Sequence, residues 1–384
     1  MSQWSKCDIE MMSLAISLAE KGRYTTRPNP NVGCVIVASG EIIGQGYHIK
    51  AGGPHAEIHA LKDVENRQLQ QLLPQATAYV TLEPCSHYGR TPPCAKALIA
   101  AKVKRVVIAQ MDANPQVAGN GVRMLEKAGI KVDVGLLTAA ASQLNIGFMK
   151  RMTTGLPEIT VKLAASLDGK TALSNGVSKW ITGPEARADV QKLRARHCAL
   201  VTGVETVLAD DPSLNVRYEQ LASVQNSLAE SELQQPLRVV LDSKARLTTD
   251  YKMFTIETPI LLVSCIDYPA DVKQDFKSHV SFITIAANSD GRVDLHALFT
   301  YLGKHCNSVL VEAGASVAGS VIQSKLADTL YLYQAMKILG SHGRNLMQLD
   351  DYQTMDQIPD VQLVDCRRIG ADQRMIFKFN SPAS

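Results

Sequence analysis

Along most of the chain, apolar residues recur either at the spacing of an α-helix or in the short runs typical of a β-strand, and the two patterns alternate. Ile9, Met12, Ile16 and Ala19 recur at helical spacing before Gly22, which predicts an amphipathic helix that ends at a glycine. Strand-like runs follow at residues 32–38, 41–47, 77–82, 105–109 and 130–134. Two helical patterns begin near residues 55 and 93, and a third covers residues 122–127. This alternation predicts a layered α/β domain.

The regular pattern fades between residues 138 and 156, where Gly147, Gly155 and Pro157 indicate a domain boundary. We therefore predict a first domain at residues 1–150 and a second at residues 151–384. In the second, strands are predicted at 159–165, 199–202, 237–241, 260–264, 308–311, 329–335 and 374–379, and helices at 184–196, 295–305 and 317–326. The polar stretch at residues 218–235 is expected to be a surface excursion without chemistry.

Composition and charge are those of a soluble globular protein. The 384 residues include 46% hydrophobic and 20% charged residues, enough for two or three domains with their own cores. The formal net charge of +3 gives no reason to expect nucleic acid or a membrane surface as a partner. The sequence shows neither a secretory signal nor an apolar run long enough to span a membrane, so we expect a cytoplasmic protein.

A close group of His, Glu and Cys residues carries the most specific chemical signal. Eight cysteines are too sparse for a disulfide scaffold, but Cys85 and Cys94 follow His55-Ala56-Glu57 in order. One imidazole and two thiolates suit a catalytic Zn²⁺ that keeps its fourth position open, so we predict His55, Cys85 and Cys94 as ligands. His-x-Glu followed by Pro-Cys-x-x-Cys marks zinc nucleobase deaminases, in which the Glu is the general acid/base. Glu57 is thus the predicted catalytic residue, although eight residues rather than two separate the cysteines.

In the second half, a turn of small residues at 312–320 follows the predicted strand at 308–311. Backbone N–H groups at such a turn can bind phosphate, and glycine permits close approach. The turn matches neither the dinucleotide fingerprint nor the Walker A loop, so a packed strand-to-helix connection is an equal alternative.

Many short stretches resemble the RibD family of riboflavin biosynthesis, in which a pyrimidine deaminase is fused to a reductase. They are, in order, residues 28–33, 55–57, 81–94, 112–119, 162–170, 178–182, 206–214, 240–243 and 312–320. The stretch Thr-Leu-Glu-Pro-Cys-Ser-His-Tyr-Gly-Arg-Thr-Pro-Pro-Cys at 81–94 is similar to that family's own zinc motif, which has the long spacing between its cysteines.

The resemblance implies a cytidine-deaminase-like α/β/α domain followed by a dihydrofolate-reductase-like α/β domain. It also implies one Zn²⁺ per deaminase domain, NADPH, and a homo-oligomer, either a dimer or a tetramer. The implied substrate is 2,5-diamino-6-ribosylamino-4(3H)-pyrimidinone 5′-phosphate. This compound is deaminated to the uracil, and its ribosyl group is then reduced to ribityl.

In the first domain the resemblance assigns Asn29 and His87 to the pyrimidine and Arg90 to the substrate phosphate. A guanidinium in the loop between the cysteines suits a phosphate dianion, while an ordinary solvated arginine is the alternative. Asn29 is equally explained as a turn residue in a Pro-Asn-Pro segment.

In the second domain the resemblance assigns two groups of residues. NADPH is assigned to Ala164, Trp180, Thr206, Asp210, Ser243, Gly314, Ala315, Ser316, Val317, Ala318, Gly319 and Ser320, and the substrate to Ser178, Arg194, Leu214, Arg217 and Glu312. Core packing is the alternative for Trp180, Ala164 and Leu214. Lys162 and Asp168 either belong to the site or pair with each other, and Ser243, Lys244 and Arg246 are candidates to bind the 2′-phosphate of NADPH.

Two other functions are compatible with the zinc motif. A nucleic-acid deaminase would need a basic surface with stacking aromatics, whereas only 5% of the residues are aromatic. A structural zinc in a binding module would need a fourth protein ligand, for which His87 is the candidate, and would not need Glu57.

Overall fold

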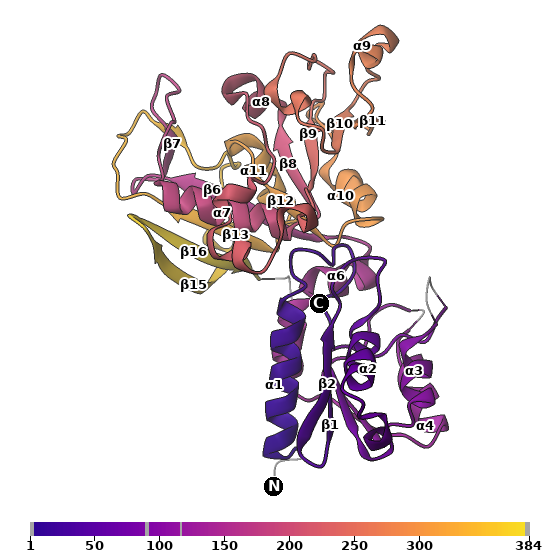
Figure 1. The fold of residues 1–384 in the computed structure, drawn as a ribbon. Helices are drawn as coiled ribbons and strands as arrows, with labels where there is room; N and C mark the ends of the chain where they lie inside the picture. Colours follow the sequence, from indigo (N-terminus) through magenta and orange to yellow (C-terminus); the bar gives the residue numbers. More distant parts are fainter. Residues whose placement is uncertain (1–3, 89–91, 116, 381–384) are drawn as a thin grey trace. The chain divides into compact units, whose positions relative to one another are not determined.

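The computed structural model describes residues 4–88, 92–115 and 117–380, which form two compact units (Figure 1). The units are Met1–Gly155 and Leu156–Ser384. The division falls after residue 155 rather than at residue 150 because helix α6 (Ile146–Thr154) continues through the predicted boundary. Gly155, with φ of 76°, then ends that helix in the left-handed conformation that glycine adopts readily.

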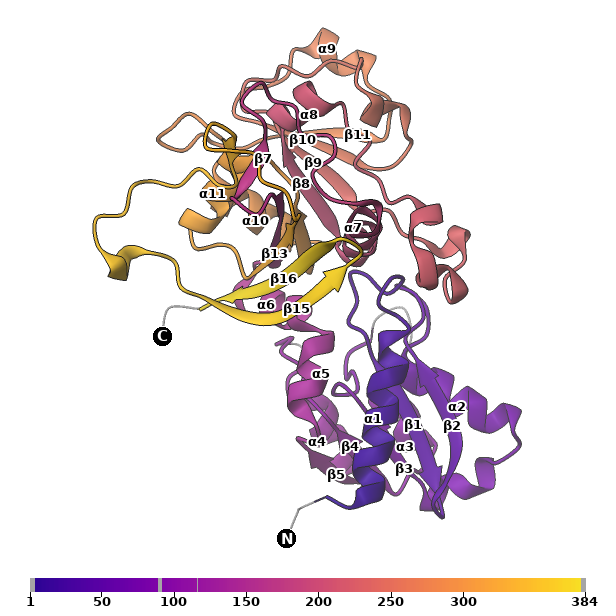
Figure 2. The ribbon, with the colours of Figure 1, turned by 90° about the vertical axis from the view of Figure 1, so that its left-hand side faces the viewer.

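The first unit is a sheet covered by helices on both faces. Its strand order is β2-β1-β3-β4-β5, formed by β1 (Gly33–Ala38), β2 (Glu41–Tyr47), β3 (Thr77–Val80), β4 (Arg105–Ile108) and β5 (Lys131–Val134). Strand β1 is antiparallel to β2 and β3, whereas β3, β4 and β5 are parallel. Helices α1 (Lys6–Glu20) and α5 (Thr138–Leu144) cover one face, and α2 (Ala56–Asn66), α3 (Cys94–Ala100) and α4 (Asn120–Lys127) cover the other (Figure 2).

Strand β1 shows why the layers form. All six of its residues are buried, and alternate side chains point to opposite faces of the sheet. Cys34 and Ile36 belong to the apolar cluster that includes helix α2, while Val35 and Val37 belong to the cluster that includes α1. A strand buried on both faces therefore reads as one continuous apolar run.

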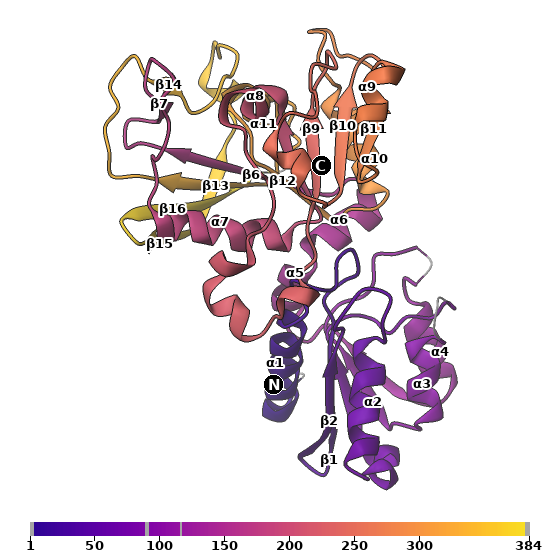
Figure 3. The same ribbon diagram turned by 45° about the horizontal axis from the view of Figure 1, so that its top comes forward.

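The second unit is built on a sheet of nine strands in the order β11-β10-β9-β8-β12-β6-β13-β16-β15. Its strands are β6 (Glu158–Ala165), β8 (Ala199–Gly203), β9 (Leu237–Leu241), β10 (Ile260–Ser264), β11 (Val280–Thr284), β12 (Ser308–Val311), β13 (Thr329–Gln334), β15 (Val361–Ile369) and β16 (Asp372–Phe379). The seven strands from β11 to β13 are parallel, and β16 and β15 add an antiparallel hairpin at one edge. At the other edge β9, β10 and β11 lie side by side (Figure 3).

Helices cover both faces of this sheet as well. Helices α10 (Leu295–Gly303) and α11 (Ala315–Gln323) pack on one face, and α7 (Pro184–Arg196) packs on the other. The remaining elements are short: β7 (Lys170–Ala172), β14 (Arg344–Asn345), α8 (Val204–Asp210), α9 (Ala270–Asp275) and the 3₁₀ segments η1 (Gln70–Gln75), η2 (Tyr218–Gln220), η3 (Ala222–Asn226), η4 (Glu230–Glu232), η5 (Lys252–Thr255) and η6 (Met355–Gln357).

The predicted α/β architecture of both halves is confirmed, and several short or exposed elements were not predicted. Helices α5 and α6 lie where the sequence pattern fades, because each buries a single residue, Ala141 and Gly147 respectively. Strand β15 is exposed along most of its length and lies at the edge of the sheet beside β16, so it carries no alternating pattern. Among the described residues, no helix is both long and apolar enough to cross a membrane.

Candidate active sites

The three predicted zinc ligands converge in the first unit. His55 is the residue before helix α2, Cys94 is the first residue of α3, and Cys85 lies in the loop after β3. His55 Nδ1 lies 3.6 Å from Cys85 Sγ and 3.3 Å from Cys94 Sγ, and the three ligand atoms all lie within 4.8 Å of one another. A tetrahedral zinc with ordinary Zn–N and Zn–S bonds separates such ligand atoms by about 3.6 Å, so the group fits this ion.

The ligand group has the composition of an open site. Within the described residues it contains these three side chains, and His87 is not part of it. His87 is exposed and lines a small pocket of about 350 Å³ with Ser86 and residues of helix α4. Three protein ligands are typical of catalytic zinc, whereas structural zinc usually has four.

The surroundings of Cys85 favour its thiolate form, whereas the hydrogen bond to Cys85 and burial raise the pKa of Cys94. Cys94 lowers the pKa of the Cys85 thiol to about 4, since its side chain donates to that sulfur, and His55 acts in the same direction against the effect of burial. The backbone N–H of Cys94 also donates to Cys85 Sγ at 3.3 Å. The pair therefore offers a sulfur that is already anionic at neutral pH, the form that binds metal.

Glu57 lies beside this group in the first turn of helix α2. Glu57 is 3% exposed, and its Oε2 has no hydrogen-bond partner among the residues that the structure describes. Burial raises the pKa of the Glu57 carboxyl. A buried carboxyl oxygen without a protein partner, next to three metal ligands, is a group free to exchange protons with water and substrate.

The other predicted residues of the first unit take different positions. Asn29 Nδ2 lies 3.1 Å from His48 Nε2, and the His48 ring packs edge-on against the ring of the ligand His55. Asn29 is thus linked to the metal site through one intervening ring. Arg90 lies outside the described residues.

Glu83 is a residue of this site that the sequence analysis did not single out. Its carboxylate accepts hydrogen bonds from the backbone N–H groups of Gly119 at 3.0 Å and Gly121 at 2.9 Å, where helix α4 begins. A Cβ on Gly121 would lie 2.1 Å from the carbonyl oxygen of Pro84, so only glycine fits. Glu83 therefore fixes the Pro84-Cys85 segment against α4. The position of this acidic residue, two residues before the predicted zinc ligand Cys85, was the sequence signal that could have identified it.

The second unit contains a cavity of about 1,700 Å³ at the carboxyl ends of its parallel strands. Ends of β6, β8, β9 and β12 contribute to it, the usual location of ligands in open α/β sheets. Eight lysine or arginine residues and four acidic residues line it, so its charge favours anionic ligands. Its volume exceeds the 300–1,000 Å³ typical of one small ligand, which suits a dinucleotide and a substrate together.

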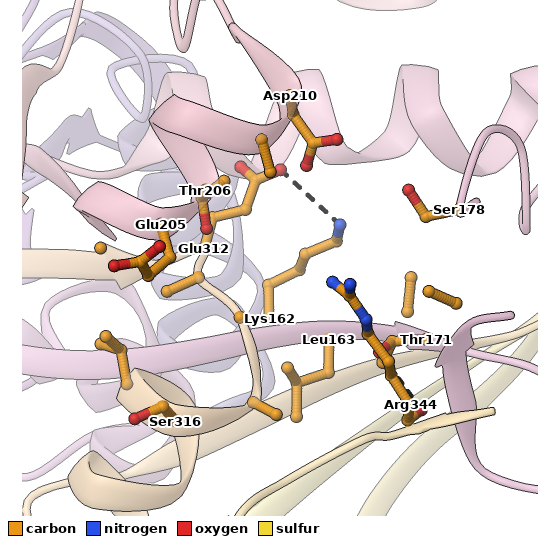
Figure 4. A pocket seen from close by; sticks show the side chains of 18 of the residues that line it. Lys162, Leu163, Thr171, Ser178, Glu205, Thr206, Asp210, Glu312, Ser316 and Arg344 are labelled. Atoms are coloured by element: carbon orange, nitrogen blue, oxygen red, sulfur yellow. Dashed lines mark hydrogen bonds and ion pairs between the residues drawn. The ribbon is translucent and has the colours of Figure 1, made fainter. Parts of the chain in front are cut away.

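Glu312 and two cations form the charged centre of this cavity. Arg194 Nε and Nη2 donate to the two carboxylate oxygens of Glu312 at 2.8 and 2.9 Å, and Lys162 Nζ lies 3.6 Å from Oε1 (Figure 4). Burial raises the pKa of Glu312, but the charges of Arg194 and Lys162 outweigh burial and lower the pKa to about 2. Arg194 Nη1 also donates to the carbonyl of Asn215 at 3.0 Å.

The cavity brings together most of the predicted reductase residues. Those that line it are Ala164, Ser178, Trp180, Arg194, Thr206, Asp210, Arg217, Ser243, Glu312, Gly314, Ala315, Ser316, Val317 and Ser320. Lys162, Lys244 and Arg246 line it too, whereas Asp168 instead accepts hydrogen bonds from the backbone N–H groups of Leu339 and Gly340. Trp180 is 63% exposed and stacks under the guanidinium of Arg187, so it is not a core residue.

Leu214, Ala318 and Gly319 are not among the lining residues, because all three face packed regions. A Cβ on Gly319 would lie 1.8 Å from the carbonyl oxygen of Gln348. Residues 343–349, here called the strap, cross this point. The strap is held by the pairing of β14 with β7 and by the Gln348 N–H, which donates to the carbonyl of Ala315 at 3.1 Å. Gly319 thus allows the strap to pack on α11.

The strap and residues of the polar stretch were missed as part of the cavity. Arg344 of the strap and Gln220 both line it (Figure 4 labels Arg344). Neither lies in a regular apolar pattern or in a recognisable motif, and only the fold brings them to the strand ends.

Comparisons with known proteins give the same division. The family model of the RibD C-terminal domain matches residues 157–374, and the model of the cytidine and deoxycytidylate deaminase zinc-binding region matches residues 5–110. A riboflavin biosynthesis protein RibD from Haemophilus influenzae is 47% identical over 382 residues, which cover 98% of this chain and 99% of that protein.

Two solved structures are similar over nearly the whole chain. One form of RibD from Acinetobacter baumannii has a TM-score of 0.89 at 42% identity and covers 98% of this chain and 99% of its own. A Thermotoga maritima protein described as a diaminohydroxyphosphoribosylaminopyrimidine deaminase/5-amino-6-(5-phosphoribosylamino)uracil reductase has a TM-score of 0.84 at 31% identity, with coverage of 97% and 99%. On this evidence, the chain belongs to the RibD family of riboflavin biosynthesis proteins.

Proposed function

We infer that this chain is a bifunctional enzyme of riboflavin biosynthesis. It deaminates 2,5-diamino-6-ribosylamino-4(3H)-pyrimidinone 5′-phosphate and then reduces the ribosyl group of the resulting uracil, giving 5-amino-6-ribitylamino-uracil 5′-phosphate. This function rests on the observation that one chain contains both sites. The first unit has three metal ligands beside the buried Glu57, and the second unit has a cationic cavity around Glu312. Family membership over nearly the full length supports both activities.

In the deaminase, His55, Cys85 and Cys94 are the residues that hold the zinc ion. When bound, zinc makes water a nucleophile at neutral pH. Glu57 accepts a proton from water as the water oxygen bonds to the amidine carbon, and donates that proton to the ring nitrogen. It then transfers the remaining hydroxyl proton to the amine, so that ammonia leaves and a carbonyl remains. Burial raises the pKa of Glu57, which suits a group that must both take and give protons.

In the reductase, NADPH supplies the hydride. The turn at residues 312–320, with Thr206, Asp210 and Ser243, lines the part of the cavity that we assign to NADPH. Glu312 and Lys162 place an anionic acceptor and a cationic donor 3.6 Å apart in the same cavity. Such a pair can bind and orient the hydroxyl groups of a ribosyl chain through charge-assisted hydrogen bonds.

The substrate phosphate requires a cation with free donors. Three of the five N–H donors of Arg194 already bond to Glu312 and to a backbone carbonyl, so we assign its guanidinium to orienting Glu312. Arg217 lines the same cavity, and its side chain bonds to the neutral amide of Gln220. We therefore assign the phosphate of the reductase substrate to Arg217.

Ammonia release and NADPH oxidation, measured side by side on the diaminopyrimidinone ribosyl phosphate, test this function. Both should occur, with ammonia released first. Ammonia release from cytidine or tRNA but not from this substrate would leave only the zinc deaminase chemistry. A homo-oligomer, either a dimer or a tetramer, and a cytoplasmic location stay predictions; analytical ultracentrifugation tests the first.

A further inference from the structure

We propose that Gln220, in the polar segment at residues 218–235, is a positioning residue that presents Arg217 to the phosphate of the reductase substrate. The proposal rests on the assignment of that phosphate to Arg217 made above. It assigns a role in substrate binding to a segment whose composition predicts no functional residues. The segment follows Arg217 directly and returns to the sheet at β9.

The backbone at Arg217 and at the residue before it is fixed by two glutamines. The N–H of Arg217 donates to Gln191 Oε1 at 3.0 Å, and Gln191 is a 3% exposed residue of helix α7. The preceding residue, Val216, exchanges two hydrogen bonds with Gln235: its N–H donates to Oε1 at 2.8 Å, and its carbonyl accepts from Nε2 at 2.9 Å. The start and end of the polar segment are therefore joined next to Arg217, and its Cα position is set before any ligand binds.

The side chain of Arg217 is held by Gln220. Its Nη1 donates to Gln220 Oε1 at 3.2 Å, and both residues line the cavity. Gln220 lies three residues on, in the 3₁₀ segment η2, and its backbone N–H donates to the Arg217 carbonyl at 3.1 Å. Residues three apart lie on the same side of a 3₁₀ turn, so this geometry brings the amide over the guanidinium.

A neutral acceptor suits this task for an electrostatic reason. A carboxylate would hold the guanidinium equally well but would compensate its charge, as Glu312 does for Arg194 in the same cavity. An amide oxygen restricts the guanidinium while leaving its full charge and its other donors for an incoming dianion. Part of the conformational entropy that the long side chain would lose on binding is then lost already in the free enzyme.

The polar segment is ordered by contacts of its own. Leu221, Val224 and Leu228 are buried, although the segment is polar overall. The Tyr218 hydroxyl donates to the carbonyl of Leu228 at 2.7 Å, and Gln225 Nε2 donates to the carbonyl of Tyr218 at 2.9 Å. These contacts support η2, and they supply a control, because Gln225 donates its hydrogen bond within the same segment to Tyr218 and not to Arg217.

The test compares Gln220→Leu with Gln225→Leu and Arg217→Ala in steady-state reductase assays. The substrate is the ribosylaminouracil phosphate, and the same uracil without its phosphate serves as a second substrate. Gln220→Leu should raise KM for the phosphorylated substrate roughly fivefold, the effect of one hydrogen bond, with kcat and KM for NADPH unchanged. The kcat/KM for the compound without phosphate should be the same as in wild type. Gln225→Leu should leave all of these values unchanged, and Gln220→Ala repeats the test with a smaller side chain.

The outcomes separate the two proposals. If Arg217→Ala leaves KM for the phosphorylated substrate unchanged, the assignment of the phosphate to Arg217 is wrong. If Arg217→Ala raises this KM but both Gln220 variants do not, the positioning role is overturned. It is also overturned if Gln225→Leu has the same effect as Gln220→Leu, or if the substrate without phosphate is affected equally, since either result indicates general loosening of the segment.

Discussion

Replacement of Glu312 by glutamine should destabilise the second unit in a manner that depends on pH. The Glu312 side chain is 16% exposed and bonds to Arg194 through both oxygens, with Lys162 beside it. These charges outweigh burial and lower its pKa from 4.5 to about 2. A difference of about 2.5 pKa units corresponds to about 3 kcal/mol of unfolding free energy.

The sign follows from the direction of the shift. A carboxyl whose pKa is lower in the folded state than in the unfolded state stabilises the protein at pH values above its unfolded-state pKa of 4.5. This contribution is lost as the pH falls from 4.5 through the folded-state pKa of about 2. The difference in unfolding free energy between wild type and Glu312→Gln should therefore be largest at pH 7 and about 2 kcal/mol smaller at pH 3.

Urea unfolding at a series of pH values measures this difference. Hydrogen–deuterium exchange of peptides from β12 and α7 would report on the second unit alone. Glu205→Gln is the matched control, because Glu205 pairs with Arg246 at a side chain that is 79% exposed, and its loss should cost less than about 1 kcal/mol. A Glu312→Gln effect no larger than this control, or one that does not change with pH, would refute the reasoning.

Three further predictions concern the two units separately. Cys94→Ser should reduce the zinc content of the protein, measured by elemental mass spectrometry, at least tenfold. The control Cys306→Ser changes a buried cysteine of the second unit and should leave the zinc content at one ion per chain. Asp8→Asn should lower the unfolding free energy of the first unit by about 1–3 kcal/mol, since the buried Asp8 carboxylate accepts from the N–H of the N-cap Ser5 in the capping box of α1 and pairs with Arg105; urea unfolding followed by hydrogen–deuterium exchange of α1 measures this loss. Gly319→Ala should lower the unfolding free energy of the second unit by about 1–3 kcal/mol and raise KM for NADPH, because the new methyl group meets the carbonyl of Gln348. An unchanged unfolding free energy would contradict this prediction and show that the strap moves away at little cost.

Features with a strong local cause could be predicted from the sequence. Strands β9, β10 and β12 are buried along most of their length and consist mostly of apolar residues, so they were predicted with the bounds that the structure has. Two of the three zinc ligands, His55 and Cys94, lie at helix starts, and Cys85 lies in the loop after β3; the order of these residues in the sequence already indicated that they converge. Local patterning was sufficient in both cases.

Features that depend on partners distant in sequence could not be predicted. The resemblance assigned Arg194 to the substrate, but no local pattern indicated that its guanidinium bonds to Glu312, which is 118 residues away. Gly319 was expected at NADPH, and its actual constraint is the strap, which has no sequence pattern. The polar segment at 218–235 was predicted to lack chemistry, whereas Gln220 bonds to Arg217 in the cavity. Each of these contacts is made by the fold rather than by a motif.

The most direct test of the two-step function is the behaviour of Glu57→Ala with each substrate. The variant should keep its zinc, because Glu57 is not a ligand, and should release no ammonia from the diaminopyrimidinone ribosyl phosphate. It should oxidise NADPH only when the deaminated uracil is supplied, at the rate of wild type. Ammonia release by the variant at the wild-type rate, or failure to oxidise NADPH with the uracil while wild type does so, would contradict the account.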